Sequence, residues 1–331
     1  MAELFDKLPF ENLYWNQMET LPPSELRELQ TLRLRRAVER AKELPLYRDF
    51  FAKNPLSDAD FQSPEDVRRL PLTTETQLLD QYPAGLWTVP RHEIARLYAQ
   101  KNGLLTALTR QDVQTQADLT ARLMYGTGTR SNHFVQISLK FDRAGAGFAY
   151  QAGVECIGAA AVPQGGENAE ILSAPTDFLN SLNVNGICAE TKCLADVFSG
   201  AGCQSLSLDY AHVPAGPDVL NRRGELEDRW NLKIWLNWSH PAFFGAGMAN
   251  ECYLRDGMHL QEDAFLFEIV NPQTLEPVKD GLPGELVVTD LAREAQTLLR
   301  FRTGVTAVIN SAPCACGRTG RRVTFLPSAE K

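Results

Sequence analysis

The sequence predicts an α/β fold made of layered subdomains, and three observations carry that prediction. Between about residues 90 and 240, short apolar runs alternate with helix-like segments, as in a largely parallel sheet covered by helices. From residue 241 onward the signals are mostly those of strands. The chain has 331 residues, 44% of them hydrophobic and 22% charged, which suits a globular compound domain of two or three subdomains.

Helical signals dominate the first 80 residues. Ser24 follows two prolines and suits a helix N-cap, and apolar side chains recur at helical spacing between Leu26 and Leu44. Pro45 is then expected to end that helix, because proline lacks the N–H that a continuing helix needs. The elements expected in the middle part are helices at 111–123 and 218–230 and strands at 134–139, 157–162 and 232–236.

Residues 241–331 are expected to form a β-rich subdomain. Runs at 264–270 and 285–289 predict neighbouring strands, separated by proline and glycine turns. A further pair of strands, at 298–302 and 305–309, is expected to flank Thr303-Gly304. The chain is therefore divided into a helical segment at 1–80, an α/β core at 81–240 and this β-rich part.

The balance of charges excludes two classes of partner. Lys and Arg total 33 and Asp and Glu total 41, a net charge of −8, so the chain lacks the basic surface that nucleic acid or an anionic membrane requires. No apolar run approaches the roughly 18 residues of a membrane span, and the first residues lack a secretory signal. We therefore expect a cytoplasmic protein whose seven cysteines are free thiols or metal ligands.

Eight short motifs, spread along nearly the whole chain, match those of one protein family in their order and spacing. They lie at 15–22, 44–48 (LPLYR), 70–74 (LPLTT), 82–86 (YPAGL), 257–263, 284–289 (GELVVT), 299–304 (LRFRTG) and 314–319 (CACGRT). Together they resemble the phenylacetate–CoA ligase branch of the adenylate-forming, or acyl-CoA synthetase, superfamily. The resemblance implies the N-terminal large domain of such enzymes, with two stacked α/β subdomains and a small distorted β-barrel. The C-terminal lid domain is expected to be absent, because the chain ends at Lys331.

The resemblance also implies an ATP site, and several of its motifs are altered. Where the family has a phosphate loop rich in glycine and hydroxyl groups, the chain has a shorter loop with Asn102 and Gly103. His240 stands where a glutamate would hold magnesium, and imidazole is a poor ligand for that hard cation. Val305 replaces the aspartate that would bind the ribose. We therefore expect a degenerate ATP site at Asn102, Gly103, His240 and Val305, with no use of ATP or Mg²⁺.

These changes favour an acyl-handling enzyme that has lost ATP-dependent adenylation. It would transfer an aromatic acyl group from a coenzyme A or carrier-protein thioester in specialised metabolism, with His240 as the general base. One alternative is a pseudoenzyme that binds an aromatic acid or scaffolds a full-length ligase or carrier protein. Another is an aryl–CoA or aryl–adenylate ligase with a remodelled nucleotide site. A homodimer is also considered.

In the family, aromatic acids bind between the middle of the sheet and the segment before His240. Aromatic and polar side chains that could stack on and hydrogen-bond such an acid occur at both places here. The alternative is that the aromatic residues simply pack the core. The expected acyl pocket comprises Phe134, Phe141, Asn237, Trp238, Ser239, His240 and Phe243.

Four residues of the β-rich part form a candidate zinc site. Cys252 and His259, with Cys314 and Cys316 further on, offer the thiolate and imidazole ligands that zinc favours, and four closed ligands are typical of structural sites. Relatives with the CACGRT motif are expected to share the site. Elsewhere the sequence offers three thiols that could act as an acyl-accepting nucleophile if a histidine lowered the pKa of one of them. These thiols are Cys188, Cys193 and Cys203.

Overall fold

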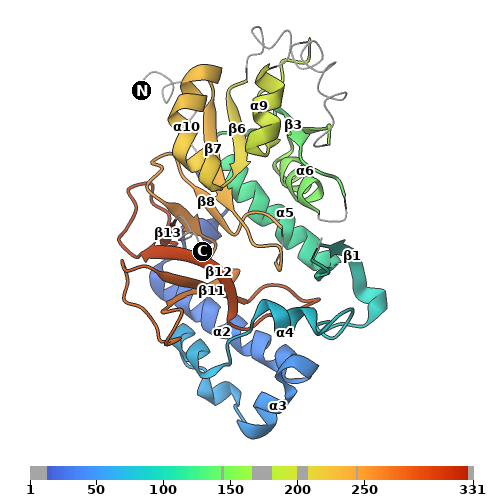
Figure 1. Cartoon of the computed structure of the whole chain (residues 1–331), viewed down its shortest axis with the longest axis vertical. Coiled ribbons are helices and arrows are strands. Elements are labelled where there is room, and N and C mark those ends of the chain that lie inside the picture. The colour runs from blue at the N-terminus through green and yellow to red at the C-terminus, as the bar shows by residue number, and fades with distance from the viewer. Residues whose placement is uncertain are drawn as a thin grey trace. The chain divides into compact units, whose positions relative to one another are not determined.

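The computed structural model describes residues 13–100, 102–142, 145–165, 181–199, 208–243 and 245–326 (Figure 1). The chain divides into two compact units, each assembled from separate stretches of sequence. The parallel-sheet unit contains the described residues of Met1–Asn16, Gln116–Ser239 and Gly245–Arg255. The antiparallel-sheet unit contains those of Gln17–Thr115, His240–Phe244 and Asp256–Lys331.

The parallel-sheet unit is built on six strands in the order β4-β3-β5-β6-β7-β8. The first five run parallel, and β8 pairs antiparallel with β7. All their carboxyl ends except that of β8 therefore meet at one edge, where open α/β sheets usually bind ligands. The strands are β3 (Phe134–Ser138), β4 (Ala160–Pro163), β5 (Gly186–Ala189), β6 (Tyr210–Pro214), β7 (Lys233–Trp238) and β8 (Ala249–Glu251).

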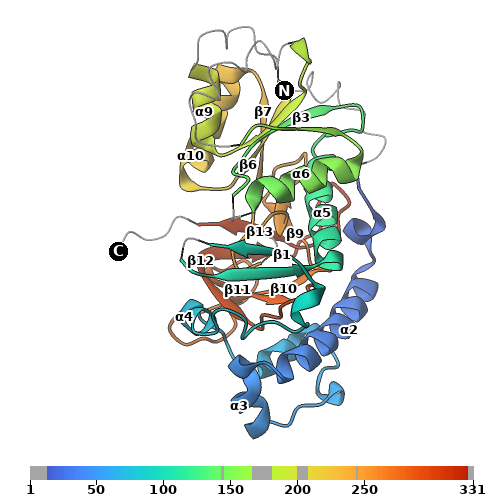
Figure 2. The same cartoon turned by 90° about the vertical axis from the view of Figure 1, so that its right-hand side faces the viewer.

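Helices cover both faces of this sheet, with α9 and α10 on one side and α5 and α6 on the other (Figure 2). Gly153 lets α6 approach α5 closely, because a Cβ there would lie 2.5 Å from the Thr120 Cγ2 atom. The apolar side chains of α5, α6 and β3 form one buried cluster. The helices are α5 (Arg110–Tyr125), α6 (Ala146–Ile157), α9 (Thr191–Ser199) and α10 (Pro217–Trp230).

The antiparallel-sheet unit holds five strands in the order β10-β11-β12-β13-β9 and a separate hairpin of β1 and β2. Among the described residues no pairing joins the two ends of the five-stranded sheet, so it is open and the expected small barrel is not closed. The strands are β1 (Ile94–Ala99), β2 (Leu105–Thr109), β9 (Met258–Leu260), β10 (Phe265–Val270), β11 (Gly284–Asp290), β12 (Phe301–Asn310) and β13 (Arg322–Phe325).

The N-terminal helices pack on these strands and do not form a separate part. Leu34 of α2 belongs to a buried cluster that also contains Leu266, Leu291 and Leu299. This grouping differs from the three consecutive segments expected from the sequence, because the apolar face of α2 finds its partners more than 200 residues later. The helices are η1 (Gln17–Thr20), α2 (Pro23–Lys42), α3 (Pro45–Lys53), η2 (Asp58–Asp60), η3 (Pro64–Arg69), α4 (Glu75–Leu79) and η4 (Arg91–Glu93).

Proline positions shift the expected boundaries of the first helices. The N-cap of α2 is Pro22, not Ser24, and Pro23 occupies the first turn, where its fixed φ angle suits a helix start. Pro45 does end the first helix, yet it also begins α3 in the same role. A proline that stops one helix can therefore start the next.

The two strands expected around Thr303-Gly304 are one continuous strand with a bulge. Glu285 of β11 pairs with Thr306, whereas Val287 pairs with Arg302, so β12 carries extra residues at this point. Gly304 lies at φ +69°, which glycine tolerates without strain. The glycine in the motif thus produces a bulge inside a strand, where the sequence pattern predicts a turn.

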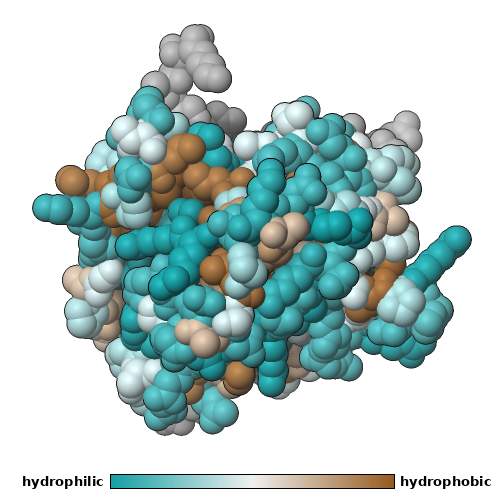
Figure 3. Space-filling model, turned by 90° about the horizontal axis from the view of Figure 1, so that it is seen from below, coloured by the Kyte–Doolittle hydropathy of each residue, from teal (hydrophilic) through white to brown (hydrophobic). Residues whose placement is uncertain are grey.

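The face of the molecule that Figure 3 shows is mostly polar. Hydrophilic side chains cover most of the face in Figure 3, where hydrophobic ones gather in one larger area. None of the helices in the described ranges combines the length and apolar character that a bilayer crossing requires.

We expect Leu34→Ala to destabilise the protein by about 2–5 kcal/mol, because the fully buried side chain leaves a cavity in the core of the antiparallel-sheet unit. Leu32→Ala on the same helix is the matched control. Its side chain is 45% exposed, and the change should cost less than about 0.5 kcal/mol. Urea unfolding followed by circular dichroism measures both, and equal losses would contradict the packing described for α2.

Candidate active site and metal centre

The carboxyl edge of the parallel sheet presents Asn237 in a fixed orientation. The Tyr150 hydroxyl donates a hydrogen bond of 2.7 Å to Asn237 Oδ1, and Asn237 Nδ2 donates one of 3.2 Å to the carbonyl of Val213. Burial raises the pKa of Tyr150 far above its ordinary value, so the phenol stays a donor. Trp238 completes β7 and Ser239 follows it.

Two of the three phenylalanines predicted for the acyl pocket lie at opposite ends of β3. Phe141 follows the carboxyl end of β3 and packs edge-on against Phe148, with ring centroids 5.3 Å apart. Phe134 begins β3 at the opposite edge and is 39% exposed. The strand register puts it about five residues, or roughly 15 Å, from the level of Asn237. The structure therefore removes Phe134 from the expected pocket.

The loop at the expected phosphate site is the tight turn of the β1–β2 hairpin. Gln100 N–H donates to the Leu104 carbonyl at 2.8 Å, and Gly103 N–H donates to the Gln100 carbonyl at 3.1 Å. The Leu104 amide donates to Asn102 Oδ1 at 3.2 Å. Three amides are thus used within the turn, and Asn102 Nδ2 reaches outward to Glu75 Oε1 at 2.6 Å. Such a turn offers few free amides to a phosphate.

His240 belongs to the antiparallel-sheet unit and packs among aromatic rings. Its ring centroid lies 5.1 Å from that of Phe301, and the Ala242 amide donates to its Nδ1 atom at 3.2 Å. Burial lowers the pKa of His240 to about 4, although Glu75 acts in the opposite direction. The imidazole is therefore neutral at pH 7 and a weak base, unlike the general base of near-neutral pKa that the sequence predicts.

Phe243 is a core residue of the same unit. Its side chain is fully buried and lies 5.7 Å from Phe265 and 5.9 Å from Phe301 between ring centroids. The fully buried Arg293 holds this segment in place, since its Nη1 atom donates to the Ala242 carbonyl at 3.0 Å. Arg293 was not singled out by the sequence, and no local pattern distinguishes it from a surface arginine.

Val305 lies in the bulge of β12, beside a carboxylate from β11. Glu285 accepts a hydrogen bond from Arg302 Nε at 2.9 Å and from the Gly304 amide at 3.2 Å. Arg302 is therefore held by an ion pair within the sheet. The aspartate expected at 305 is absent, and the carboxylate nearest along this bulge is already occupied by two donors.

Three of the four predicted metal ligands meet in the antiparallel-sheet unit. The ligand atoms of His259, Cys314 and Cys316 lie within 4.8 Å of one another, and all three residues are buried. His259 Nε2 is 3.3 Å from Cys316 Sγ, and His259 Nδ1 is 3.0 Å from the Gly320 carbonyl. A proton on Nδ1 would be donated to that carbonyl and would leave Nε2 free as a ligand, the usual arrangement at metal sites. The fourth residue, Cys252, is buried in the parallel-sheet unit, and six residues separate it from His259 in the chain.

A buried cation lies next to this cluster. The Arg318 amide and its Nη1 atom donate to Cys316 Sγ at 3.5 and 3.8 Å. Arg318 Nε also pairs with Glu19 Oε1 at 2.9 Å, and both side chains are at most 3% exposed. Donors of this kind favour the thiolate form that metal binding requires. The donor set fits zinc, which prefers sulfur and imidazole nitrogen.

The two predicted nucleophilic thiols that the structure describes, Cys188 and Cys193, are both buried. Cys188 is fully buried in β5, and burial raises its pKa well above the ordinary value. His212 is the neighbouring base on β6, but burial lowers its pKa to about 3. Cys193 is buried in α9, and Cys203 lies outside the described residues. A buried thiol with a raised pKa is inert.

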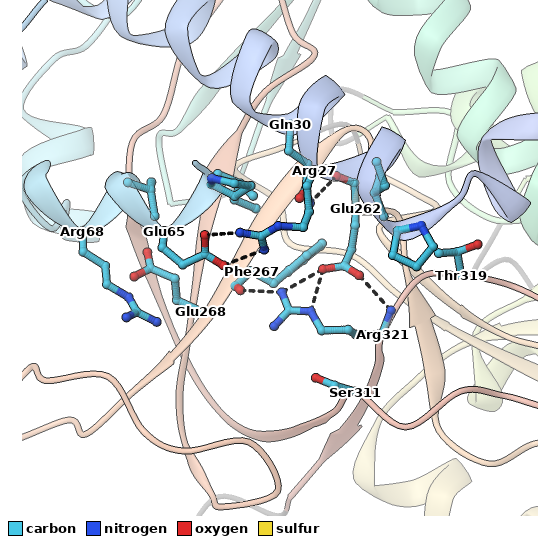
Figure 4. A pocket seen from close by; sticks show the side chains of 15 residues that line it. Arg27, Gln30, Glu65, Arg68, Glu262, Phe267, Glu268, Ser311, Thr319 and Arg321 are labelled. Atoms are coloured by element: carbon cyan, nitrogen blue, oxygen red, sulfur yellow. Dashed lines mark hydrogen bonds and ion pairs between the residues drawn. The ribbon is translucent and has the colours of Figure 1, made fainter. Parts of the chain in front are cut away.

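A cavity of about 380 Å³ beside the N-terminal helices is lined by charged side chains that pair with one another (Figure 4). Arg27 and Glu65 pair across it with two hydrogen bonds of 2.6–2.7 Å, and Arg321 pairs with Glu262 at 2.7 Å. Gln30 donates to the Glu262 carbonyl. These charged side chains largely satisfy one another, which leaves little net charge to recognise a ligand.

Comparisons with known proteins agree on one family. The chain is 32% identical to the phenylacetate–coenzyme A ligase of Thermus thermophilus over 94% of its length and 72% of that protein. It is 30% identical to the enzyme of the same name from Pseudomonas putida, over 86% and 67%, and 29% identical to that of Escherichia coli, over 88% and 69%. The chain therefore belongs to the phenylacetate–coenzyme A ligase family. A scan against family models finds no match.

Solved structures support the same fold. A 2-hydroxyisobutyryl-CoA ligase in an open conformation superposes with a TM-score of 0.87 at 22% identity, over 95% of this chain and 72% of that one. A long-chain-fatty-acid–CoA ligase from Archaeoglobus fulgidus reaches 0.52 at 14% identity, over 72% and 52%. The mixed α/β fold of the adenylate-forming large domain, expected from the sequence, is confirmed.

The expected function needs a correction. An ATP-independent acyltransferase that has lost adenylation is contradicted by the relatives, which are named as coenzyme A ligases along 86–94% of this chain. The expectation treated each changed residue in an ATP motif as a loss of ATP binding. A nucleotide site also uses backbone groups and neighbouring side chains, so a changed letter indicates remodelling as readily as loss.

The free energy of unfolding should depend on pH because His240 is a buried, neutral imidazole. Its pKa of about 4 lies below the 6.5 of an unperturbed histidine, so between these values the unfolded chain binds more protons. The free energy of unfolding should therefore fall as the pH drops from 6.5 to 4, by on the order of 3 kcal/mol from this residue.

Comparison of the wild type with His240→Gln isolates that contribution, because the variant lacks the titrating ring and keeps a polar side chain. Urea unfolding at pH 7, 5.5 and 4 gives the difference between the two proteins. Parallel pH dependences would show that His240 is not a buried neutral imidazole.

Proposed function

We propose that the protein is an acid–coenzyme A ligase whose nucleotide site differs from that of its relatives at several residues. In this reaction the carboxylate of an acid attacks the α-phosphorus of ATP, and the bond to the β-phosphate breaks to release pyrophosphate. The thiol of coenzyme A then attacks the acyl carbon of the acyl-AMP, and AMP leaves. The observation that carries the proposal is the identity of 29–32% to four phenylacetate–coenzyme A ligases along 86–94% of this chain.

A small aromatic acid is the substrate class that we infer. The relatives are named for phenylacetate, and the carboxyl edge of the parallel sheet carries Phe141, Asn237 and Trp238. An aromatic ring can be held by stacking, while the Asn237 amide, fixed by Tyr150, offers a hydrogen bond of set direction. Phe134 and Phe243 are left out, since one lies at the wrong edge and the other in the core.

We also propose that Cys252, His259, Cys314 and Cys316 bind a structural zinc ion. Three of these ligands already meet in the antiparallel-sheet unit, and Cys252 follows from the sequence. Bound zinc would fix the segment after β12 to β9 through thiolate and imidazole bonds. Four protein ligands leave no open position for a substrate, so the role would be structural.

Incubation with ATP, Mg²⁺ and radiolabelled pyrophosphate tests the first half-reaction. We expect ATP–pyrophosphate exchange that depends on an added aromatic acid. Tyr150→Phe should raise the concentration of acid needed by roughly two- to tenfold, because Asn237 loses the donor that orients it. Tyr125→Phe, on the same unit and without a hydroxyl hydrogen bond in the described residues, is the control.

Formation of the coenzyme A thioester is measured separately by mass spectrometry. The proposal fails if a panel of aromatic and short-chain acids gives no exchange and calorimetry finds no nucleotide binding at millimolar ATP. Exchange without thioester would restrict this chain to the adenylation step.

Purified protein should contain about one zinc ion per chain by inductively coupled plasma mass spectrometry. Cys316→Ser should lose the ion and melt at a lower temperature, because metal binding stabilises only the folded state. Cys156→Ser, an exposed cysteine of the other unit, is the control and should keep the zinc. Zinc retained at the wild-type level in both Cys314→Ser and Cys316→Ser would refute this site.

A further inference from the structure

We propose that Glu75 supplies the carboxylate that holds the divalent cation accompanying ATP, a task that His240 is unsuited to perform. The inference rests on the proposed function, because such a cation is needed only where a nucleotide binds. All residues that carry it belong to the antiparallel-sheet unit.

Backbone pairing fixes Glu75 close to the His240 segment. Thr73, two residues before Glu75, donates its N–H to the Arg300 carbonyl at 2.9 Å. The Arg302 amide donates to the Thr73 carbonyl at 2.9 Å, so Thr73 pairs with Phe301 as a strand would. The ring of Phe301 lies 5.1 Å from that of His240. These contacts link the start of α4 to His240, the position where the family is expected to have a glutamate.

The β1–β2 hairpin contacts both Glu75 and the segment that follows His240. Asn102 Nδ2 donates to Glu75 Oε1 at 2.6 Å, and Thr106 Oγ1 donates to the Pro241 carbonyl at 3.2 Å. The loop at the position expected to meet the phosphates therefore holds a carboxylate at its tip. The negative charge of Glu75 also acts electrostatically on His240, which supports their proximity.

Glu75 has the properties that a magnesium ligand needs. Its side chain is exposed, it forms no ion pair with Lys or Arg in the described ranges, and Oε2 accepts no hydrogen bond there. Magnesium in nucleotide sites is usually held by one or two carboxylates together with phosphate oxygens and water. One free carboxylate oxygen with an adjacent amide group meets that requirement.

Two other carboxylates of this unit near the motifs, Glu285 and Asp112, are already occupied. Glu285 accepts from Arg302 and from the Gly304 amide. Asp112 is fully buried and accepts three backbone N–H donors, those of Thr109, Glu294 and Ala295. Both are needed where they are, whereas Glu75 can give an oxygen to a cation without losing a structural contact.

The test measures the binding of ATP by calorimetry with Mg²⁺ and with EDTA, in the wild type and in Glu75→Gln. Glutamine keeps an acceptor for Asn102 and removes only the charge. In the wild type we expect Mg²⁺ to strengthen binding by roughly tenfold to a hundredfold, and in Glu75→Gln this gain should disappear. Relaxation enhancement of water protons by Mn²⁺, with ATP present, gives an independent readout of the bound metal.

Two further variants make the result specific. Glu43→Gln, an exposed glutamate at the end of α2, should keep the wild-type dependence on metal. Glu75→Gln combined with His240→Glu should recover it, because a carboxylate returns beside the same site. A gain from Mg²⁺ that survives in Glu75→Gln overturns this assignment alone. A wild type that binds no ATP under either condition overturns the proposed function and this assignment with it.

Discussion

The buried ion pair between Arg293 and Asp290 is the interaction on which the His240 end of the antiparallel-sheet unit depends. Their charged atoms are 2.8 Å apart, and neither side chain is more than 1% exposed. Arg293 also donates to the Ala242 carbonyl and lies over the Phe243 ring, so it positions the segment that begins with His240. Burial raises the pKa of Asp290, which Arg293 opposes. Loss of either partner would leave a buried charge unpaired, at a cost of about 3–5 kcal/mol.

The candidate site combines the fold of the family with altered residues at the positions expected to bind ATP. The fold is that of acid–coenzyme A ligases. The loop expected to bind phosphate is a tight turn in which the amides of Gln100, Gly103 and Leu104 donate to acceptors within the turn itself. The neutral His240 and the free carboxylate of Glu75 lie together on the same unit. Under the proposal made above, Glu75 would supply the carboxylate that the His240 position lacks.

The sequence predicts strand and helix positions well where the pattern is local. β3, β7, β10, α5 and α10 begin and end within a few residues of the expected bounds. Prediction fails where partners are distant in sequence. The bulge at Gly304 depends on pairing with Glu285, and the exclusion of Phe134 depends on the register across four strands. The cluster of His259, Cys314 and Cys316 was predicted because cysteine and histidine can be recognised as candidate metal ligands from the sequence alone. Glu75 and Arg293 carry no such signal.

The discontinuous make-up of both units has a consequence for the newly made chain. The apolar face of α2, with Leu34 and Val38, is synthesised long before Leu266 and Leu299, which cover it in the folded protein. Residues made soon after α2, such as Tyr47 and Phe61, belong to the same cluster, but the part of it supplied by the later strands is still missing at that stage. Contacts between residues so far apart in sequence slow folding. Apolar surface left uncovered in a partly made chain favours aggregation, so the early part of this protein is its vulnerable part until the strands of the second half are made.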